Sequence, residues 1–320
     1  MASVAHQIRS LRALGIGVDV LEIKGLPRVK YLQCLPRVRR LAPDVDLIHA
    51  HFGFSGWLAR CQNKRPVVVS FMGDDLLGTP DGKGRVTRAS RFAVALNRLM
   101  ARVVDAVIVK SAEMARVVAP VRAHVVPNGV DLELFRPIDP ATCRQQLEWP
   151  DGRYVLFAGD PDNPRKGFPL ARQAVDLASS EFGTPLTLVP LKQVPLAHVP
   201  HYMNACEAVL LTSFIEGSPN VVKEAMACNL PVIAVPVGDV AEQLAGVENC
   251  VVVPRDPAVV AAALVKALTS ARRSNGRAVL IARGLDNPSV AKRIVSIYGA
   301  VIAARREGAA ETKPIGEETC

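Results

Sequence analysis

The 320-residue chain lacks any apolar run near the roughly 18 residues needed to cross a bilayer. It also lacks the apolar core of a secretory signal, because its opening "MASVAHQIRSLRALG" has arginines at helical spacing. Its seven cysteines are odd in number, scattered and without a CxxC pair, which excludes a disulfide framework and indicates core residues in a reducing compartment. These absences favour a cytoplasmic protein, and the length suits two domains.

The excess of basic over acidic residues lies entirely in the first half of the chain. Residues 1–137 carry 21 Lys and Arg against 11 Asp and Glu, whereas the remainder carries 18 against 19. In the dense stretch "KGLPRVKYLQCLPRVRR" the basic residues are Lys24, Arg28, Lys30, Arg37, Arg39 and Arg40. A basic segment interleaved with apolar residues is typical of a surface for anionic lipid or another polyanion, and a solvated helix face is the alternative.

Short apolar runs alternate with helical patterns along the whole chain. In the first half we predict strands at residues 18–23, 45–51, 66–71, 106–110 and 123–127. The helices between them are predicted at residues 4–14, at 27–41 with a break at Pro36, near 85–103 and from Ser111. After a turn-rich segment, strands are predicted at 154–159, 186–190, 208–212, 231–236 and 250–254. Such strands separated by helices indicate an α/β protein with two doubly wound domains facing a cleft.

The turn-rich segment sets the predicted domain boundaries. The first Rossmann-like domain covers residues 1–137 and the second covers 138–286. An amphipathic helix over 287–306 is expected to cross back to the first domain, and 307–320 to be a disordered tail. A doubly wound domain normally opens with a strand and a glycine-rich turn, whereas this chain begins inside a helix. We therefore expect a truncated start.

The most informative stretch is "EGSPNVVKE", residues 216–224. Ser218 is predicted to cap a helix whose first residue is Pro219, and Asn229 to take a left-handed conformation at its end. The helix follows the strand predicted at 208–212, so its N-terminus lies at the carboxyl edge of a parallel sheet. Free N–H groups and the helix dipole at that edge favour a phosphate.

Two carboxylates flank this helix N-terminus. Glu224 lies on the helix face of Asn220 and leans back toward the N-terminus, where it could accept hydrogen bonds from a ribose diol. Glu216 lies in the turn and could hold the hydroxyls of a second sugar. The alternative for Glu216 is a solvated loop residue without a binding role, and the alternative for Glu224 is an exposed helix residue. For Glu224 the alternative is weak, because the helix is apolar nearly all round and a buried carboxylate needs partners.

The segment "EGSPNVVKEAMACNLPVIAVPVGDVAEQL" resembles the donor-site signature of family 4 glycosyltransferases, which are retaining enzymes with the GT-B fold. Further similar segments are "VVVSFMGDDLLG", "VVPNGVDLELFRP" and "FAGDPDNPRKGF". Within the family, the chain resembles polysaccharide and teichuronic-acid-type transferases. The resemblance implies a nucleotide-sugar donor, held by the second domain, and a glycan or lipid-linked acceptor, held by the first.

The resemblance also implies roles for individual residues. Glu224 would bind the ribose and Glu216 the donor sugar, while Lys166, helped by Arg165, would neutralise the diphosphate and stabilise the leaving group. The donor-binding residues would be Gly217, Ser218, Asn220, Val221 and Glu224. Members of this kind need no metal or other cofactor, and no nucleic acid is expected as a partner. A peripheral place on the inner face of the membrane fits the basic first half.

Two positions depart from the family pattern. Asp160 stands where many members have a clamping arginine, and Met72 where many have a histidine. The family's first strand and its glycine-rich loop have no counterpart. Two alternatives to a transferase therefore stay open: a sugar-nucleotide epimerase on the same fold, and a degenerate non-catalytic subunit.

Four further polar residues end predicted strands of the first domain. His49 and His51 share one face of a strand. A metal site would need further ligands, so the alternative is that His51 faces the cleft and the acceptor. Asp74 and Asp75 follow the next strand, where they either contact acceptor or sugar or cap the loop.

Overall fold

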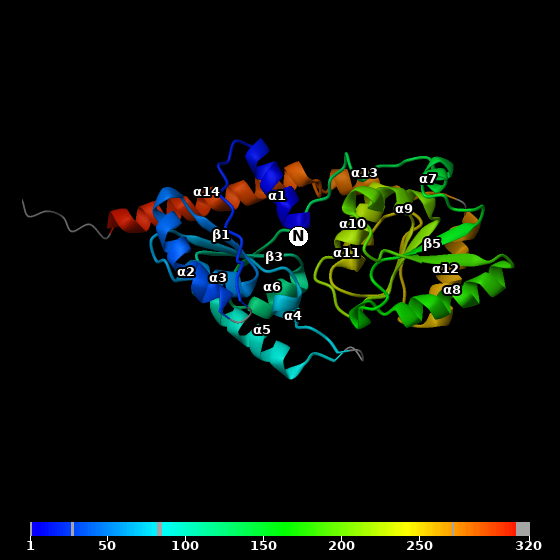
Figure 1. The fold of residues 1–320 in the computed structure, drawn as a ribbon, viewed down its shortest axis with the longest axis horizontal. Helices are drawn as coiled ribbons and strands as arrows, with labels where there is room; N and C mark the ends of the chain where they lie inside the picture. The colour runs from blue at the N-terminus through cyan, green and yellow to red at the C-terminus, as the bar shows by residue number, and fades with distance from the viewer. Residues whose placement is uncertain (1, 27–28, 82–84, 271, 312–320) are drawn as a thin grey trace, which may run out of the picture.

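The computed structural model describes residues 2–26, 29–81, 85–270 and 272–311. Two α/β domains lie beside each other, and the long helix α14 (Asn287–Glu311) runs from the C-terminal domain along the N-terminal one (Figure 1). No helix in these residues is both long and apolar enough to span a bilayer.

The N-terminal domain is built on a four-stranded parallel sheet in the order β1-β2-β3-β4. Its strands are β1 (Ile48–His51), β2 (Val67–Ser70), β3 (Ala106–Val109) and β4 (Ala123–Val125). Its helices are α1 (Ala2–Ala13), α2 (Lys30–Leu41), α3 (Gly53–Arg60), α4 (Asp74–Leu77), α5 (Arg88–Ala101) and α6 (Ala112–Val118). Strands β2 and β3 are buried throughout, as expected for a parallel sheet with helices on both faces.

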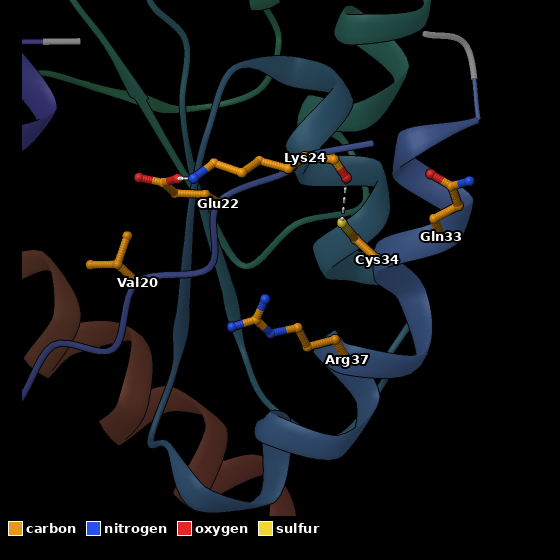
Figure 2. A pocket seen from close by; sticks show the side chains of 6 residues that line it. All are labelled: Val20, Glu22, Lys24, Gln33, Cys34 and Arg37. Atoms are coloured by element: carbon orange, nitrogen blue, oxygen red, sulfur yellow. Dashed lines mark hydrogen bonds and ion pairs between the residues drawn. The ribbon is translucent and has the colours of Figure 1, made fainter. Parts of the chain in front are cut away.

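The predicted strand at residues 18–23 is wrong. The segment carries no strand hydrogen bonds, because within the described chain β1 pairs only with β2. An alternating pattern produces a strand only where a neighbouring backbone is available. The segment instead borders a pocket of about 400 Å³ against α2, lined by Val20, Glu22, Lys24, Gln33, Cys34 and Arg37 (Figure 2).

The break predicted at Pro36 is also absent, since α2 continues through that residue. Its N-terminal boundary differs as well, because the helix begins at Lys30 and residues 27–28 of the predicted helix, Arg28 included, lie outside the described residues. Cys34 and Val38 face inward from α2 and pack with Leu58. This packing offsets the one backbone hydrogen bond that a proline removes.

The C-terminal domain contains a five-stranded parallel sheet in the order β6-β5-β7-β8-β9. Its strands are β5 (Arg153–Phe157), β6 (Leu186–Pro190), β7 (Ala208–Leu211), β8 (Val232–Ala234) and β9 (Val251–Val252). Its helices are α7 (Pro140–Gln146), α8 (Phe168–Phe182), α9 (Val199–Ala205), α10 (Asn220–Ala227), α11 (Val240–Leu244), α12 (Pro257–Ser270) and α13 (Gly276–Ala282). The strand order reverses between β5 and β7, and ligands of doubly wound sheets bind outside the carboxyl ends of strands at such a reversal.

Helix α14 connects the two domains. Its residues Val290 and Ile294 share a buried cluster with Val68 and Ile108 of the N-terminal sheet and with Leu11 of α1. The helix runs to Glu311, five residues into the predicted disordered tail, so residues 307–311 are helical; residues 312–320 lie outside the described part. The apolar pattern of the helix therefore fixes it against the N-terminal sheet.

We expect Ile294→Ala to destabilise the protein by about 2–5 kcal/mol, because the side chain is 1% exposed and its removal leaves a cavity. Thermal unfolding followed by circular dichroism measures the loss. Ile281→Ala is the matched control, since that isoleucine is 50% exposed and should cost less than about 0.5 kcal/mol. Equal losses in the two variants would contradict the packing of α14.

Candidate donor and acceptor site

The helix N-terminus at the motif differs from its prediction in one respect. Helix α10 begins at Asn220, and its capping position is Pro219, which offers no side-chain hydrogen bond. The Ser218 hydroxyl instead accepts a hydrogen bond from Lys223 Nζ at 2.9 Å. The predicted serine cap is wrong because the buried lysine takes its oxygen, and the first N–H groups of α10 are left without a side-chain cap. Asn229 has the predicted left-handed conformation, with φ of 54°.

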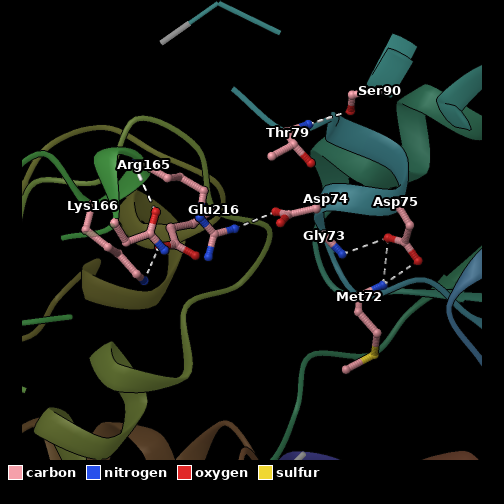
Figure 3. A network of polar contacts seen from close by, with 10 residues as sticks. Met72, Gly73, Asp74, Asp75, Thr79, Ser90, Arg165, Lys166 and Glu216 are labelled. Carbon is pink, nitrogen blue, oxygen red and sulfur yellow. Dashed lines mark hydrogen bonds and ion pairs between the residues drawn. The ribbon is translucent and has the colours of Figure 1, made fainter. Parts of the chain in front are cut away.

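Glu216 and Lys166 form an ion pair at the strand-order reversal. Their Oε1 and Nζ atoms are 2.7 Å apart, and the side chains are only 10% and 18% exposed (Figure 3). Glu216 follows β7, whereas Lys166 ends the short 3₁₀ turn Pro164–Lys166 after β5. A Cβ atom at Gly159 would lie 2.9 Å from the Lys166 stem, so this glycine lets the lysine lie close over the loop.

The two loops that carry this pair are held together by direct hydrogen bonds. The Phe214 N–H donates to the carbonyl oxygen of Arg165 at 2.8 Å. The Thr212 hydroxyl lies 3.1 Å from the carbonyl oxygen of Lys166, and Arg255 Nη1 donates to the Thr212 carbonyl at 2.8 Å. The loops after β5 and β7 therefore form one unit, which fixes Lys166 opposite Glu216.

Arg165 points the other way and reaches the N-terminal domain. Its Nη1 forms an ion pair with Asp74 Oδ1, which joins residues 91 positions apart (Figure 3). Asp75 has a different role, because its Oδ1 accepts hydrogen bonds from the backbone N–H groups of Met72 and Gly73 at 3.0 and 2.9 Å. Burial raises the pKa of Asp75, and these N–H groups act in the opposite direction. Of the two alternatives for Asp75, the structure has the loop cap.

Glu224 is half-buried, and its carboxylate has no hydrogen-bond partner among the residues that the structure describes. Burial raises the pKa of this carboxyl to about 7, although the charge of the neighbouring Lys223 acts to lower it. A buried carboxylate without hydrogen bonds is unfavourable in a folded protein. The carboxylate of Glu224 is therefore free to accept hydrogen bonds from a ligand, for example from a pair of hydroxyl groups.

The two histidines of β1 are stacked, with ring centroids 4.5 Å apart. His49 is half-buried and has a structural role, since its ring nitrogens lie 2.5 Å from the Tyr298 hydroxyl and 2.8 Å from the Ser70 hydroxyl. His51 Nδ1 is buried without a partner in the described chain, and burial lowers the pKa of His51 to about 4. No three side chains of the metal-binding types gather around a common point in the described residues.

The two domains touch where the turn of the motif, at Gly217, meets the loop after β2. A Cβ atom at Gly217 would lie 3.1 Å from Gly73 Cα and 3.1 Å from Met114 Sδ, so the turn of the motif needs a glycine to meet the loop after β2. Nearby, Asn128 Nδ2 donates to Asn220 Oδ1 at 3.2 Å. The site residues of the two domains therefore face each other across a closed interface.

Sequence reasoning missed two basic residues at this interface, Lys110 after β3 and Lys223 within α10. Both are almost fully buried. The available signal was a lysine at the end of the apolar run "AVIVK" and another inside "NVVKEAMA". Of the departures from the family pattern, Asp160 accepts a hydrogen bond from the Asp162 N–H at 2.9 Å and stays in its own loop.

Solved structures with the same arrangement are glycosyltransferases and related synthases. Sucrose-phosphate synthase from Thermosynechococcus elongatus superposes with a TM-score of 0.69 at 22% identity, over 90% of this chain and 83% of that chain. Anabaena Alr3699/HepE, solved in complex with UDP and glucose, superposes with a TM-score of 0.65 at 20% identity, over 92% and 89%. The two facing parallel sheets thus define a protein of the GT-B class, which confirms the predicted fold.

Two family models match successive parts of the chain. A "Glycosyl transferase 4-like domain" matches residues 2–129, and "Glycosyl transferases group 1" matches residues 155–270. The chain belongs to the GT4-type glycosyltransferases, as the motif predicted.

Curated relatives have related names. TuaC of Bacillus subtilis, named for a glycosyltransferase of teichuronic acid biosynthesis, is 28% identical over 69% of this chain and 61% of its own length. A D-inositol 3-phosphate glycosyltransferase of Frankia alni is 28% identical over 67% and 63%. The chain thus spans less than two thirds of the length of these two relatives. The epimerase alternative is not favoured, since the named relatives are transferases.

The raised pKa of Glu224 predicts a pH-dependent effect of its removal. Folding disfavours the ionised carboxyl, so its penalty is absent below pH 4.5, the ordinary pKa, and complete above about pH 7. Glu224→Gln should therefore raise the free energy of unfolding by about 1–3 kcal/mol at pH 8, the partial exposure of the side chain reducing the gain, and leave it unchanged near pH 4.

Thermal unfolding at the two pH values measures this difference. Glu242→Gln, on the exposed face of α11, is the matched control and should change neither value. A Glu224→Gln effect of equal size at both pH values would rule out the buried ionised carboxylate as its cause.

Proposed function

We propose that this protein transfers a sugar, with retention of configuration, from a nucleotide-sugar donor to a glycan or lipid-linked acceptor in cell-envelope or exopolysaccharide synthesis. The observation that carries the proposal is the Lys166–Glu216 ion pair at the strand-order reversal, with Glu224 on the adjoining helix, whose carboxylate has no hydrogen bond within the described residues. The UDP and glucose bound by the similar HepE structure support a nucleotide-sugar donor. The name of TuaC supports a cell-envelope polymer as the product.

The proposed donor pose follows from which groups have spare hydrogen-bonding capacity. Glu224 accepts hydrogen bonds from the ribose hydroxyls, because its carboxylate has no donor within the described protein. The uncapped N–H groups at Asn220 and Val221 face the diphosphate or the sugar. Gly217 and Ser218 contribute backbone to the turn, since the Ser218 hydroxyl is already bonded to Lys223.

The proposed reaction depends on charge stabilisation. As the bond between the sugar and the diphosphate breaks, negative charge grows on the leaving group, and Lys166 with Arg165 stabilises it. Glu216 then exchanges its ion pair with Lys166 for the hydroxyls of the donor sugar. The acceptor attacks from the face that the diphosphate leaves, so no covalent protein nucleophile is needed, and we propose no metal or other cofactor.

The basic face of the N-terminal domain supports a membrane-bound acceptor. On α2 the side chains of Lys30, Arg37 and Arg40 are accessible, and Leu32 is 71% exposed among them. Cationic and apolar side chains on one helix favour a surface rich in anionic lipid. We propose that α2 holds the protein peripherally on the inner face of the membrane.

Loss of Glu224 should weaken donor binding without stopping turnover at saturation. We expect Glu224→Ala to lower donor affinity about 10- to 100-fold, the value of one or two hydrogen bonds to a charged group. Lys166→Met should instead lower kcat about 10²- to 10³-fold, because it removes charge stabilisation of the leaving group. Lys266→Met, an exposed lysine on α12, is the control for both.

Calorimetric titration with UDP-glucose, GDP-mannose and ADP-glucose measures affinity, and release of the nucleoside diphosphate in the presence of a membrane extract measures turnover. Unchanged donor affinity in Glu224→Ala would overturn the ribose assignment. Interconversion of sugars without an acceptor would instead identify an epimerase.

Membrane binding should depend on charge. We expect co-sedimentation with vesicles containing anionic phosphatidylglycerol, a decrease between 50 and 500 mM salt, and at least a tenfold loss in the Arg37→Glu, Arg40→Glu double variant. Arg39 is left unchanged because its guanidinium donates to the Cys61 carbonyl at 3.4 Å and so has a structural contact. A matched double variant on the C-terminal domain, Lys266→Glu with Arg172→Glu, is the control. Binding indifferent to salt and to α2 charge would refute this surface.

A further inference from the structure

Two lysines are buried at the interface between the domains, and neither has a role in the donor site proposed above. Lys110 directly follows β3 and is 2% exposed, and Lys223 lies on α10 and is 1% exposed. Lysine is almost never fully buried unless its charge is paired. An explanation is therefore needed for what offsets these two charges.

Protein groups satisfy the two ammonium groups only in part. Lys110 Nζ donates to the carbonyl oxygen of Val126 at 3.3 Å, and Lys223 Nζ donates to the Ser218 hydroxyl at 2.9 Å. Each partner is neutral, and each ammonium has three N–H donors. No carboxylate of the described residues comes within 4.0 Å of either nitrogen, since neither lysine forms an ion pair there.

The charged and titratable groups facing Lys110 come from three elements, α10, α4 and β1. Burial lowers the pKa of Lys110 to about 7, the charge of Lys223 from the opposite domain adds to this effect, and Asp75 acts in the opposite direction. His49 and His51 of β1 also face Lys110, whose charge lowers the pKa of both rings. A second cation and two imidazoles thus act on Lys110, and the one carboxylate that acts in its favour, Asp75, already accepts hydrogen bonds from the backbone of its own loop.

The groups facing Lys223 are Asp239, Glu224 and Lys110. Burial lowers the pKa of Lys223 to about 8, and the two carboxylates act to raise it. Asp239 is itself bonded by Gln243 Nε2 at 2.5 Å, and burial raises the pKa of Asp239. The carboxylate of Asp239 therefore compensates Lys223 only indirectly, through the Ser218 hydroxyl that both side chains contact.

We propose that Lys110, Lys223 and the unpartnered Nδ1 of His51 form an anion site between the domains, built for a phosphate group of a substrate. Lys110 and His51 belong to the N-terminal domain and Lys223 to the C-terminal domain, so the site is complete only when the domains are closed. Without an anion the two ammonium groups repel each other across the interface. A bound dianion turns this repulsion into two attractions and thereby favours closure.

The phosphate can come from the donor diphosphate or from a phosphorylated acceptor, and this assignment rests on the proposed transferase function. The anion site itself does not, because its test needs no turnover. Inorganic sulfate is the probe: it has the shape of phosphate and stays doubly charged between pH 6 and 9. Sulfate should raise the thermal midpoint of the wild-type protein above that in chloride at equal ionic strength.

The sulfate-specific rise should disappear in Lys110→Met and in Lys223→Met, which keep the apolar stem and remove the charge. It should persist in Lys266→Met, whose lysine is exposed on α12. Repeating the titration with saturating UDP separates the sources: a sulfate effect that UDP abolishes identifies the donor diphosphate, and an additive effect identifies the phosphate of an acceptor. An equal rise in all four proteins would overturn the proposal.

The pH dependence gives a second measurement that needs only the wild-type protein. Sulfate bound near Lys110 should hold it protonated, so binding at pH 8 takes up protons and is about tenfold weaker than at pH 6. Calorimetry in two buffers of different ionisation enthalpy counts the protons. Affinity independent of pH, with no proton uptake at pH 8, would contradict the site even if the lysine variants failed to fold.

Discussion

The geometry of the interface depends on how the chain crosses twice between the two sheets. The crossings lie side by side: Val130 pairs with Asp286 in an isolated parallel bridge, and the Val130 N–H and carbonyl bond Leu285 and Asn287 at 3.0 Å each. Gly129 is needed there, because a Cβ atom would lie 2.8 Å from Asn287 Cα. Helix α14 then leaves this bridge and packs on the N-terminal sheet. The two crossings therefore determine which sheet edges face each other.

Because both sheets are parallel, each presents its strand ends, and the residues that follow them, at one edge. In the C-terminal sheet these residues are Lys166 and Glu216, and in the N-terminal sheet they are His51, Asp74 and Lys110. Ion pairs satisfy some of the charges, as between Arg165 and Asp74. Within the described residues, Glu224 has no hydrogen bond, and Lys110 and Lys223 have only a neutral partner each. Such unsatisfied groups are stabilised when a ligand supplies the missing partners.

The sequence allowed the fold and the motif to be predicted because both depend on local patterns. Apolar runs at strand length and the spacing of Glu216 and Glu224 are visible within short windows. The errors arose where a distant group decides the outcome. Residues 18–23 have a strand pattern but no neighbouring strand, and Ser218 could cap α10 except that Lys223 takes its hydroxyl. The Arg165–Asp74 pair joins two loops 91 residues apart, which no window contains.

The adjacent residues Lys223 and Glu224 on α10 have different surroundings at the interface between the domains. Consecutive residues of an α-helix point about 100° apart, so Lys223 and Glu224 leave the helix in different directions. Lys223 donates to Ser218 and its charge acts on Lys110 of the other domain, while Glu224, which has no hydrogen bond within the described residues, is the acceptor that we propose for a donor ribose. Occupation of either position changes the field at the other, because the charge of each group contributes to the pKa of the other. Under the two proposals, one short helix couples the donor side of the site to closure of the domains, which accounts for a buried lysine beside a half-buried glutamate on so apolar a helix.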